Sequence, residues 1–101
     1  MKLFWTETAR NDLEAIRRYI AADNPTAASR WIDRLRRRVR NALPSPLAGR
    51  MVPESMREDI RELVEGNYRI VYQVFEERLV VLTVFEGHRL FPEDEAGNSE
   101  P

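Results

Sequence analysis

The chain has 101 residues, of which 43% are hydrophobic, so it can build one modest core and we expect a single domain. Its 16 basic and 17 acidic residues give a formal net charge of −1, which provides no overall attraction to nucleic acid or to an anionic membrane. The absence of cysteine excludes a disulfide framework and thiolate chemistry, and a single histidine, His88, argues against a zinc site. We therefore expect no metal, no cofactor and a reducing, cytoplasmic environment.

The first half of the chain predicts a short strand followed by two helices. Residues 2–5, KLFW, form an apolar strand, and apolar residues then recur at helical spacing over about 6–22 and again over about 25–43. Because the connection between the two helices is so short, they must form an antiparallel hairpin. The expected N-caps are Thr6 or Thr8 for the first helix and Asn24 for the second.

The second half changes from helical to strand periodicity. Residues 44–57 contain three prolines and a glycine and predict a surface loop. Three runs rich in β-branched and aromatic residues follow at 59–64, 67–75 and 78–86, with tight turns between them. The predicted fold class is therefore α+β, with an N-terminal strand and an antiparallel helix hairpin packed on a small antiparallel sheet.

The predicted domain covers residues 1–91, and the acidic tail at 92–101 contains too few apolar residues to pack, so we expect it to be disordered. No apolar run approaches the roughly twenty residues of a membrane span. The N-terminal sequence MKLFWTETAR lacks the apolar core and cleavage site of a secretory signal. We read the chain as mature protein with no membrane partner.

Arg69 is the unusual residue of the run GNYRIVYQV, because it lies among apolar residues of a predicted core strand. Its guanidinium keeps its charge, so it must meet water, a carboxylate or an anionic ligand. Pairing of the last two strands would bring Arg69 near His88 and Arg89, a cluster that could bind phosphate, with His88 available for proton transfer. The structural alternative, which the residue types favour, is that Arg69 pairs with Glu62 or Glu86 on a neighbouring strand.

The second predicted helix carries five arginines in the run RLRRRVR, residues 34–40. A basic helix of this kind could contact nucleic acid or an acidic protein surface, but a solvated charged face is the commoner explanation. The carboxylates of Glu62 and Glu65 fall on opposite faces of their strand, so they form no acid–base pair. The sequence also lacks a glycine-rich phosphate loop and a serine-centred nucleophile motif.

Four motif elements occur in a specific order: DLEAIRRYI in the first helix, Gly49-Arg50 after the helices, YRIVY at 68–72, and Gly87-His88-Arg89 after the last strand. In this order, over nearly the whole chain, they resemble the RelE/ParE superfamily of toxins from type II toxin–antitoxin systems. The resemblance implies a compact sheet backed by a helix hairpin, a growth-inhibiting activity, and a cognate antitoxin that wraps the toxin.

The superfamily contains two functional classes. RelE-like members are ribosome-dependent mRNA endonucleases, and in that class Arg69, His88 and Arg89 would be the catalytic group. The chain has no lysine in the loop before the second strand and no tyrosine after Arg89, and its acidic tail would repel RNA. The long helix hairpin and the DNPTAA connection resemble the ParE-like class, whose members inhibit DNA gyrase and are not nucleases. We therefore expect a gyrase-directed toxin without catalytic residues, and the endonuclease is the alternative.

The resemblance also implies the partners. We expect a ParD-like antitoxin to cover the helix hairpin and DNA gyrase to be the target, and we expect no strong direct binding of nucleic acid by the toxin alone. Acidic antitoxin residues would meet the basic helix. The expected antitoxin-binding residues are Trp31, Arg34, Arg37, Arg38 and Arg40.

Overall fold

Two helices follow the first strand, as the apolar spacing predicts. The computed structural model describes residues 1–87 and begins with β1 (Lys2–Trp5), α1 (Glu7–Ala21) and α2 (Pro25–Arg40). The N-caps are Thr6 and Asn24, whose side-chain oxygens accept hydrogen bonds from backbone N–H groups in the first turns. α2 ends slightly before the predicted boundary, because the residues just before Pro44 form turns.

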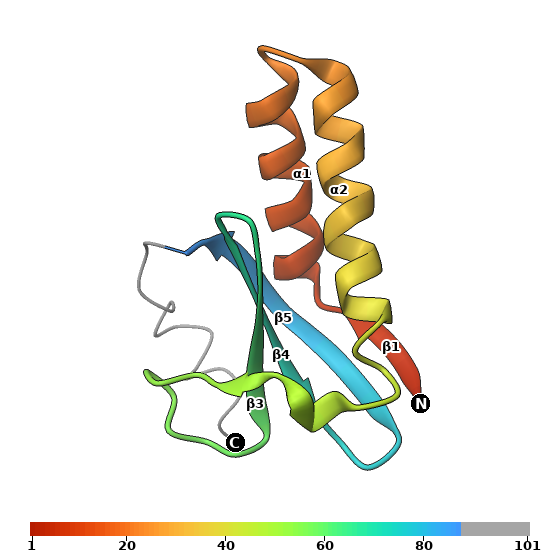
Figure 1. Cartoon of the computed structure of the whole chain (residues 1–101), viewed down its shortest axis with the longest axis vertical. Coiled ribbons are helices and arrows are strands. Elements are labelled where there is room, and N and C mark those ends of the chain that lie inside the picture. Colours follow the sequence, from red (N-terminus) through yellow and green to blue (C-terminus); the bar gives the residue numbers. More distant parts are fainter. Residues whose placement is uncertain (88–101) are drawn as a thin grey trace.

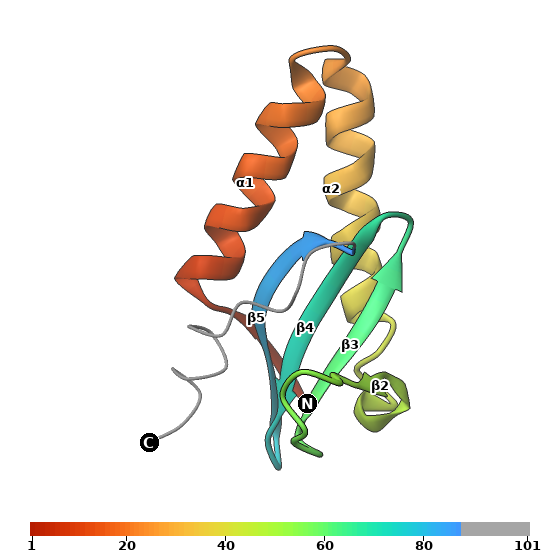
Figure 2. The same ribbon diagram turned by 90° about the vertical axis from the view of Figure 1, so that its left-hand side faces the viewer.

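The helices form an antiparallel hairpin that packs on one face of the sheet and extends well beyond its edge (Figures 1 and 2). The apolar stripe of each helix is buried between the partner helix and the sheet. None of the helices in the described part of the chain is long and apolar enough to cross a membrane. The buried helical residues are Ala9, Leu13, Ala28, Ile32, Leu35 and Val39.

Five strands form one sheet in the order β1-β5-β4-β3-β2. β3, β4 and β5 pair as two antiparallel hairpins, as predicted. β1 joins the edge parallel to β5, so the sheet is mixed rather than purely antiparallel. This pairing is possible because the helix hairpin separates the two strands and provides the long connection that parallel strands need. After the helices come η1 (Pro46–Ala48), β2 (Arg50–Met51), β3 (Ile60–Glu65), β4 (Tyr68–Val74) and β5 (Arg78–Glu86).

The two faces of the sheet carry separate apolar clusters, because the side chains of β4 alternate between the faces. Tyr68, Ile70 and Tyr72 face the helices and belong to the main core. Val71 lies on the opposite face in a smaller cluster that also contains the fully buried Val52. Val52 comes from the segment between β2 and β3, so the predicted surface loop covers part of the second face.

The structure also explains how α1 is attached to the sheet. Beyond the end of β1, the Asp12 carboxylate accepts hydrogen bonds from the Thr83 hydroxyl, at 2.6 Å, and from the Val84 N–H, at 3.0 Å. The Thr6 hydroxyl donates to the Leu82 carbonyl at 2.9 Å while it caps α1. β1 pairs only with the first part of β5. Beyond β1, the side chains of Asp12 in α1 and of its N-cap Thr6 therefore form hydrogen bonds with the exposed edge of β5.

Candidate functional site

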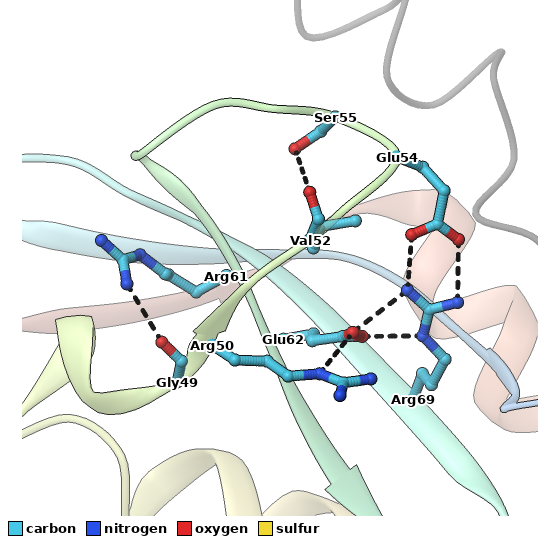
Figure 3. Close-up of polar contacts among 8 residues, drawn as sticks. All are labelled: Gly49, Arg50, Val52, Glu54, Ser55, Arg61, Glu62 and Arg69. Carbon is cyan, nitrogen blue, oxygen red and sulfur yellow. Dashed lines mark hydrogen bonds and ion pairs between the residues drawn. The ribbon is translucent and has the colours of Figure 1, made fainter.

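Arg69 lies on the second strand position of β4, on the sheet face opposite the helices (Figure 3). Its backbone is paired with Val64 of β3 on one side and Phe85 of β5 on the other. Its side chain is only 8% exposed, and the guanidinium lies 5.0 Å from the centre of the Phe85 ring. A charged group at this depth needs hydrogen-bonded anionic partners.

Two carboxylates provide those partners among the described residues. Arg69 Nε and Nη2 donate to the two Glu62 oxygens at 2.7 and 3.1 Å. Arg69 Nη1 and Nη2 donate to the two Glu54 oxygens at 3.0 and 3.1 Å. Each carboxylate is therefore held in the bidentate geometry that guanidinium groups favour, and the structural alternative for Arg69, pairing with Glu62, is confirmed.

Glu62 is the centre of this charge cluster, because its side chain is fully buried. It also accepts a hydrogen bond from Arg50 Nε at 3.0 Å, and the Arg50 side chain is 64% exposed. The charges of Arg50, Arg69, Glu54 and Glu62 sum to zero. Hydrogen bonds from Arg69 to Glu54, and then to Glu62, raise the pKa of Arg69 above its ordinary value although burial opposes them, so the guanidinium stays charged.

The Gly49-Arg50 motif has a steric basis in this cluster. A Cβ atom at Gly49 would collide with the hydroxyl of Tyr72 and approach the backbone carbonyl of Glu62 to 2.9 Å. That hydroxyl donates a hydrogen bond to the Pro46 carbonyl at 2.6 Å. A glycine at position 49 therefore lets β2 lie close to β3, which places Arg50 beside Glu62.

Sequence reasoning found Glu62 as a partner of Arg69 but missed Glu54. Glu54 lies 15 residues from Arg69, in a segment predicted only as a loop. No periodic pattern marks a loop carboxylate that folds back onto a strand, so the sequence held no signal for this contact. The expected neighbours His88 and Arg89, like the tail at 92–101, lie outside the described residues.

The expected antitoxin-binding residues fall into two groups on α2. Trp31 packs edge-to-face on Tyr68, with the ring centroids 5.5 Å apart, and covers Gly66 in the turn between β3 and β4. Arg34 stacks on the Trp31 ring at 4.5 Å and forms an ion pair with Glu65. The first group therefore ties α2 to the end of β3.

Arg38 belongs to the same group, since its Nε lies 3.4 Å from a Glu65 oxygen. Arg37 and Arg40, by contrast, project from α2 into solvent. A shallow pocket of about 240 Å³ lies beside the first group, lined by Ala27, Arg30, Trp31 and Arg34. The basic helix thus combines a structural row of side chains with an exposed row that a partner can reach.

Neither site has the composition of a metal centre. Among residues 1–87, no group of three or more histidine, cysteine, aspartate or glutamate side chains is placed to hold a metal ion. The cluster around Arg69 contains two permanent cations and two carboxylates that are already hydrogen-bonded. The charged side chains of this cluster therefore pair with one another.

The helix hairpin on one face of a mixed sheet, with a basic second helix, defines the chain as a small α+β protein of the RelE/ParE type. A solved structure titled "Chromosomal ParDE TA system from P. aeruginosa" has this fold, with a TM-score of 0.71 and 22% sequence identity over 85% of this chain and 95% of that chain. The family model described as "ParE toxin of type II toxin-antitoxin system, parDE" matches residues 3–91. The chain therefore belongs to the ParE toxin family. No curated protein matches its sequence.

Proposed function

We propose that this ParE-family toxin inhibits DNA gyrase and is neutralised by a ParD-like antitoxin in the cytoplasm. The observation that carries the proposal, beside the family itself, is the engagement of Arg69. Its guanidinium is 8% exposed and bonded to two carboxylates, so it is not presented to an RNA phosphate. A toxin that acts by binding a protein target requires no such free cation.

The alternative, a ribosome-dependent endonuclease, makes stricter chemical demands. Cleavage of RNA through its 2′-hydroxyl needs a group that takes a proton, a group that donates one, and cations on the phosphate. The sequence contains a single histidine, His88, and histidine is the residue type whose ordinary pKa lies nearest neutral pH. Glu54 and Glu62 would also repel a phosphodiester that approached Arg69.

The decisive experiment compares two assays of the same purified toxin. We expect gyrase supercoiling to be inhibited, the inhibition to be reversed by stoichiometric antitoxin, and messenger RNA in a coupled translation reaction to remain intact. Cleaved message with undisturbed supercoiling would overturn the proposal and restore Arg69, His88 and Arg89 as a catalytic group.

Substitution of His88 provides an independent prediction. His88→Ala should leave growth inhibition largely unchanged, because a gyrase inhibitor needs no proton transfer by the toxin. An endonuclease that depends on His88 for proton transfer should lose about a hundredfold or more in rate. Growth curves after induction of wild-type and variant toxin at matched protein levels make the comparison.

The proposed antitoxin surface is the exposed side of α2. Arg37 and Arg40 offer positive charge in solvent, and the pocket beside Trp31 offers an apolar contact next to Arg34. An acidic, amphipathic antitoxin segment fits this combination, because charge pairs orient it and an apolar anchor adds affinity.

A further inference from the structure

The nearly neutral charge of the chain conceals a separation of charge along it. Helix α2 contains six arginines and one aspartate, whereas residues 92–101 contain four carboxylate side chains and no basic residue. We propose that this acidic tail is an intramolecular partner of α2 and binds a row of exposed arginines, Arg30, Arg34 and Arg37. The inference goes beyond gyrase inhibition, because it assigns the basic helix a partner within the toxin itself.

The arginine row, formed by Arg30, Arg34 and Arg37, follows one face of α2. Its members are four and three residues apart, so they lie above one another on the helix, and all three are exposed. In the described part of the chain, the ion pairs of α2 are those of Arg34 and Arg38 with Glu65. Because a guanidinium has five N–H donors, Arg34 can bind a second carboxylate beside Glu65. The row therefore presents an excess of positive charge and of hydrogen-bond donors.

The described part of the chain ends close to this row. After β5, the Gly87 N–H donates a hydrogen bond to the Asn67 carbonyl in the turn between β3 and β4. The Trp31 ring covers Gly66 of the same turn, and Figure 2 shows the end of β5 and this turn close to α2. Trp31 also lines the pocket to which two arginines of the row contribute. The chain thus leaves the sheet on the side where α2 carries the row.

The acidic residues of the tail are within reach of the whole row. Glu93, Asp94 and Glu95 lie six to eight residues after Gly87, and six extended residues span about 20 Å. The row extends over seven residues of helix, which is only about 10 Å. The tail can therefore meet the row without any movement of the described helices and strands.

Other basic side chains are less suitable partners for the tail. Lys2 and Arg78 lie at the start of β1 and β5, at the opposite end of the sheet from Gly87. On α1, Arg17 and Arg18 already form ion pairs with Glu14. Because salt screens exposed charges beyond about 10 Å, the nearest excess of positive charge dominates the attraction, and that excess is the arginine row.

Charge supplies the attraction, because residues 92–101 contain no large apolar side chain. A single exposed ion pair contributes only about 0.2–1 kcal/mol, so several pairs must act together and the contact must weaken in salt. A bound tail shields the row from other anionic groups. An acidic antitoxin segment that uses Arg37 would therefore displace the tail when it binds.

The test places a single spin label in the tail of the full-length toxin. The chain contains no cysteine, so Ala96→Cys provides one attachment site between the acidic residues. In NMR spectra, we expect the label to broaden the backbone amide signals around the arginine row several-fold more than those of β1. This excess should disappear near about 0.5 M salt, where the screening length falls to about 4 Å.

Two pairs of substitutions with the same charge change identify the surface that is bound. Arg30→Ala combined with Arg37→Ala should remove most of the excess broadening on α2. Lys2→Ala combined with Arg78→Ala is the matched control at the far end of the sheet, and it should leave the broadening of α2 unchanged. Equal effects of the two pairs would mean that net charge, rather than the row, attracts the tail, and would overturn the inference.

Equal broadening of α2 and β1 in the toxin that carries only the label would also refute the contact. A mixture of spin-labelled toxin with isotope-labelled toxin that has no spin label must show no broadening, because broadening there would place the contact between two copies. If the α2 variant fails to fold, Glu93→Gln, Asp94→Asn and Glu95→Gln together provide a second variant, and it must lose the excess broadening. The outcome is separate from the gyrase proposal, because the sample contains neither gyrase nor antitoxin.

Discussion

At the level of single residues, Arg69 shows how an arginine can be part of a core strand. Its guanidinium lies over the Phe85 ring and donates hydrogen bonds to Glu54 and Glu62. Such a buried pair gives limited net stability because both ions lose their hydration. Loss of one partner is nevertheless costly, since the other charge is left buried and unpaired.

Arg69→Ala should therefore lower the free energy of unfolding by about 3–5 kcal/mol. Arg50→Ala should cost about 1 kcal/mol or less, because Arg50 is mostly exposed and Glu62 keeps its bonds to Arg69. Urea denaturation followed by circular dichroism measures both values. Similar losses for the two variants would contradict the assignment of Arg69 as the principal partner of Glu62.

The Asp59 carboxylate couples the stability of the fold to pH. Hydrogen bonds from Arg57, at 3.0 and 2.9 Å, hold the pKa of Asp59 below its ordinary value, and Gln73 adds to the effect against the influence of burial. A lowered pKa in the folded state means that the stabilisation is complete above the ordinary value. It disappears as the pH falls through the folded value.

We therefore expect Asp59→Asn to flatten the dependence of the free energy of unfolding on pH in the acid range, below about pH 5. Stability above that range should be lower in the variant than in the wild type. Urea titrations at stepwise lower pH provide the measurement, with Glu58→Gln as a control that retains the wild-type slope. An unchanged slope in Asp59→Asn would show that this carboxylate does not contribute to acid unfolding.

At the level of elements, the two N-cap residues differ in the contacts that they make outside their own helices. Asn24 caps α2 in the exposed connection at the end of the hairpin, through a bond of 3.0 Å to the Ala27 N–H. Thr6 caps α1 and also donates to the Leu82 carbonyl of β5. The first cap is local to its helix, whereas the second joins a helix to the sheet.

Thr6→Ala should consequently destabilise the protein by about 2 kcal/mol, near the upper end of the range for caps, because it also leaves the Leu82 carbonyl without this donor. Asn24→Ala should cost about 1 kcal/mol. Thermal and urea unfolding of the two variants give the comparison. Equal costs would mean that the bond from Thr6 to β5 adds nothing to the cap.

At the level of the whole molecule, the two sides of α2 differ in their contacts. One side packs on the core and binds Glu65 through Arg34 and Arg38. The other presents Arg37 and Arg40 to solvent in the last turn of α2. A partner can therefore engage α2 without competing with the contacts that hold the fold together.

For this reason Arg37→Ala should weaken antitoxin binding by about three- to tenfold without a measurable loss of stability. The effect should shrink as salt is added, because exposed charges are screened. Arg78→Ala, at the exposed first position of β5, serves as the control with the same charge change. Binding isotherms with a ParD-like antitoxin make the test, and equal weakening by both variants would argue against a surface on α2.

Local patterns in the sequence determined most elements of this protein. Helical and strand periodicity predicted the two helices and the strands β3, β4 and β5, and Thr6 and Asn24 marked the starts of α1 and α2. These features depend on neighbours a few residues apart, whose steric and hydrogen-bonding preferences act within each segment. Of the candidate group at Arg69, only the pairing with Glu62 followed from the sequence, because adjacent strands of a hairpin bring such residues together.

Contacts between distant segments were decided only by the tertiary structure. The parallel pairing of β1 with β5 and the two-residue strand β2 depend on how the chain returns to the sheet after long connections. Glu54 meets Arg69 because Val52 buries one end of the loop against the second face of the sheet. Residue types alone cannot specify such a contact, since a loop carries no periodicity and its path follows from the packing of the elements that it joins.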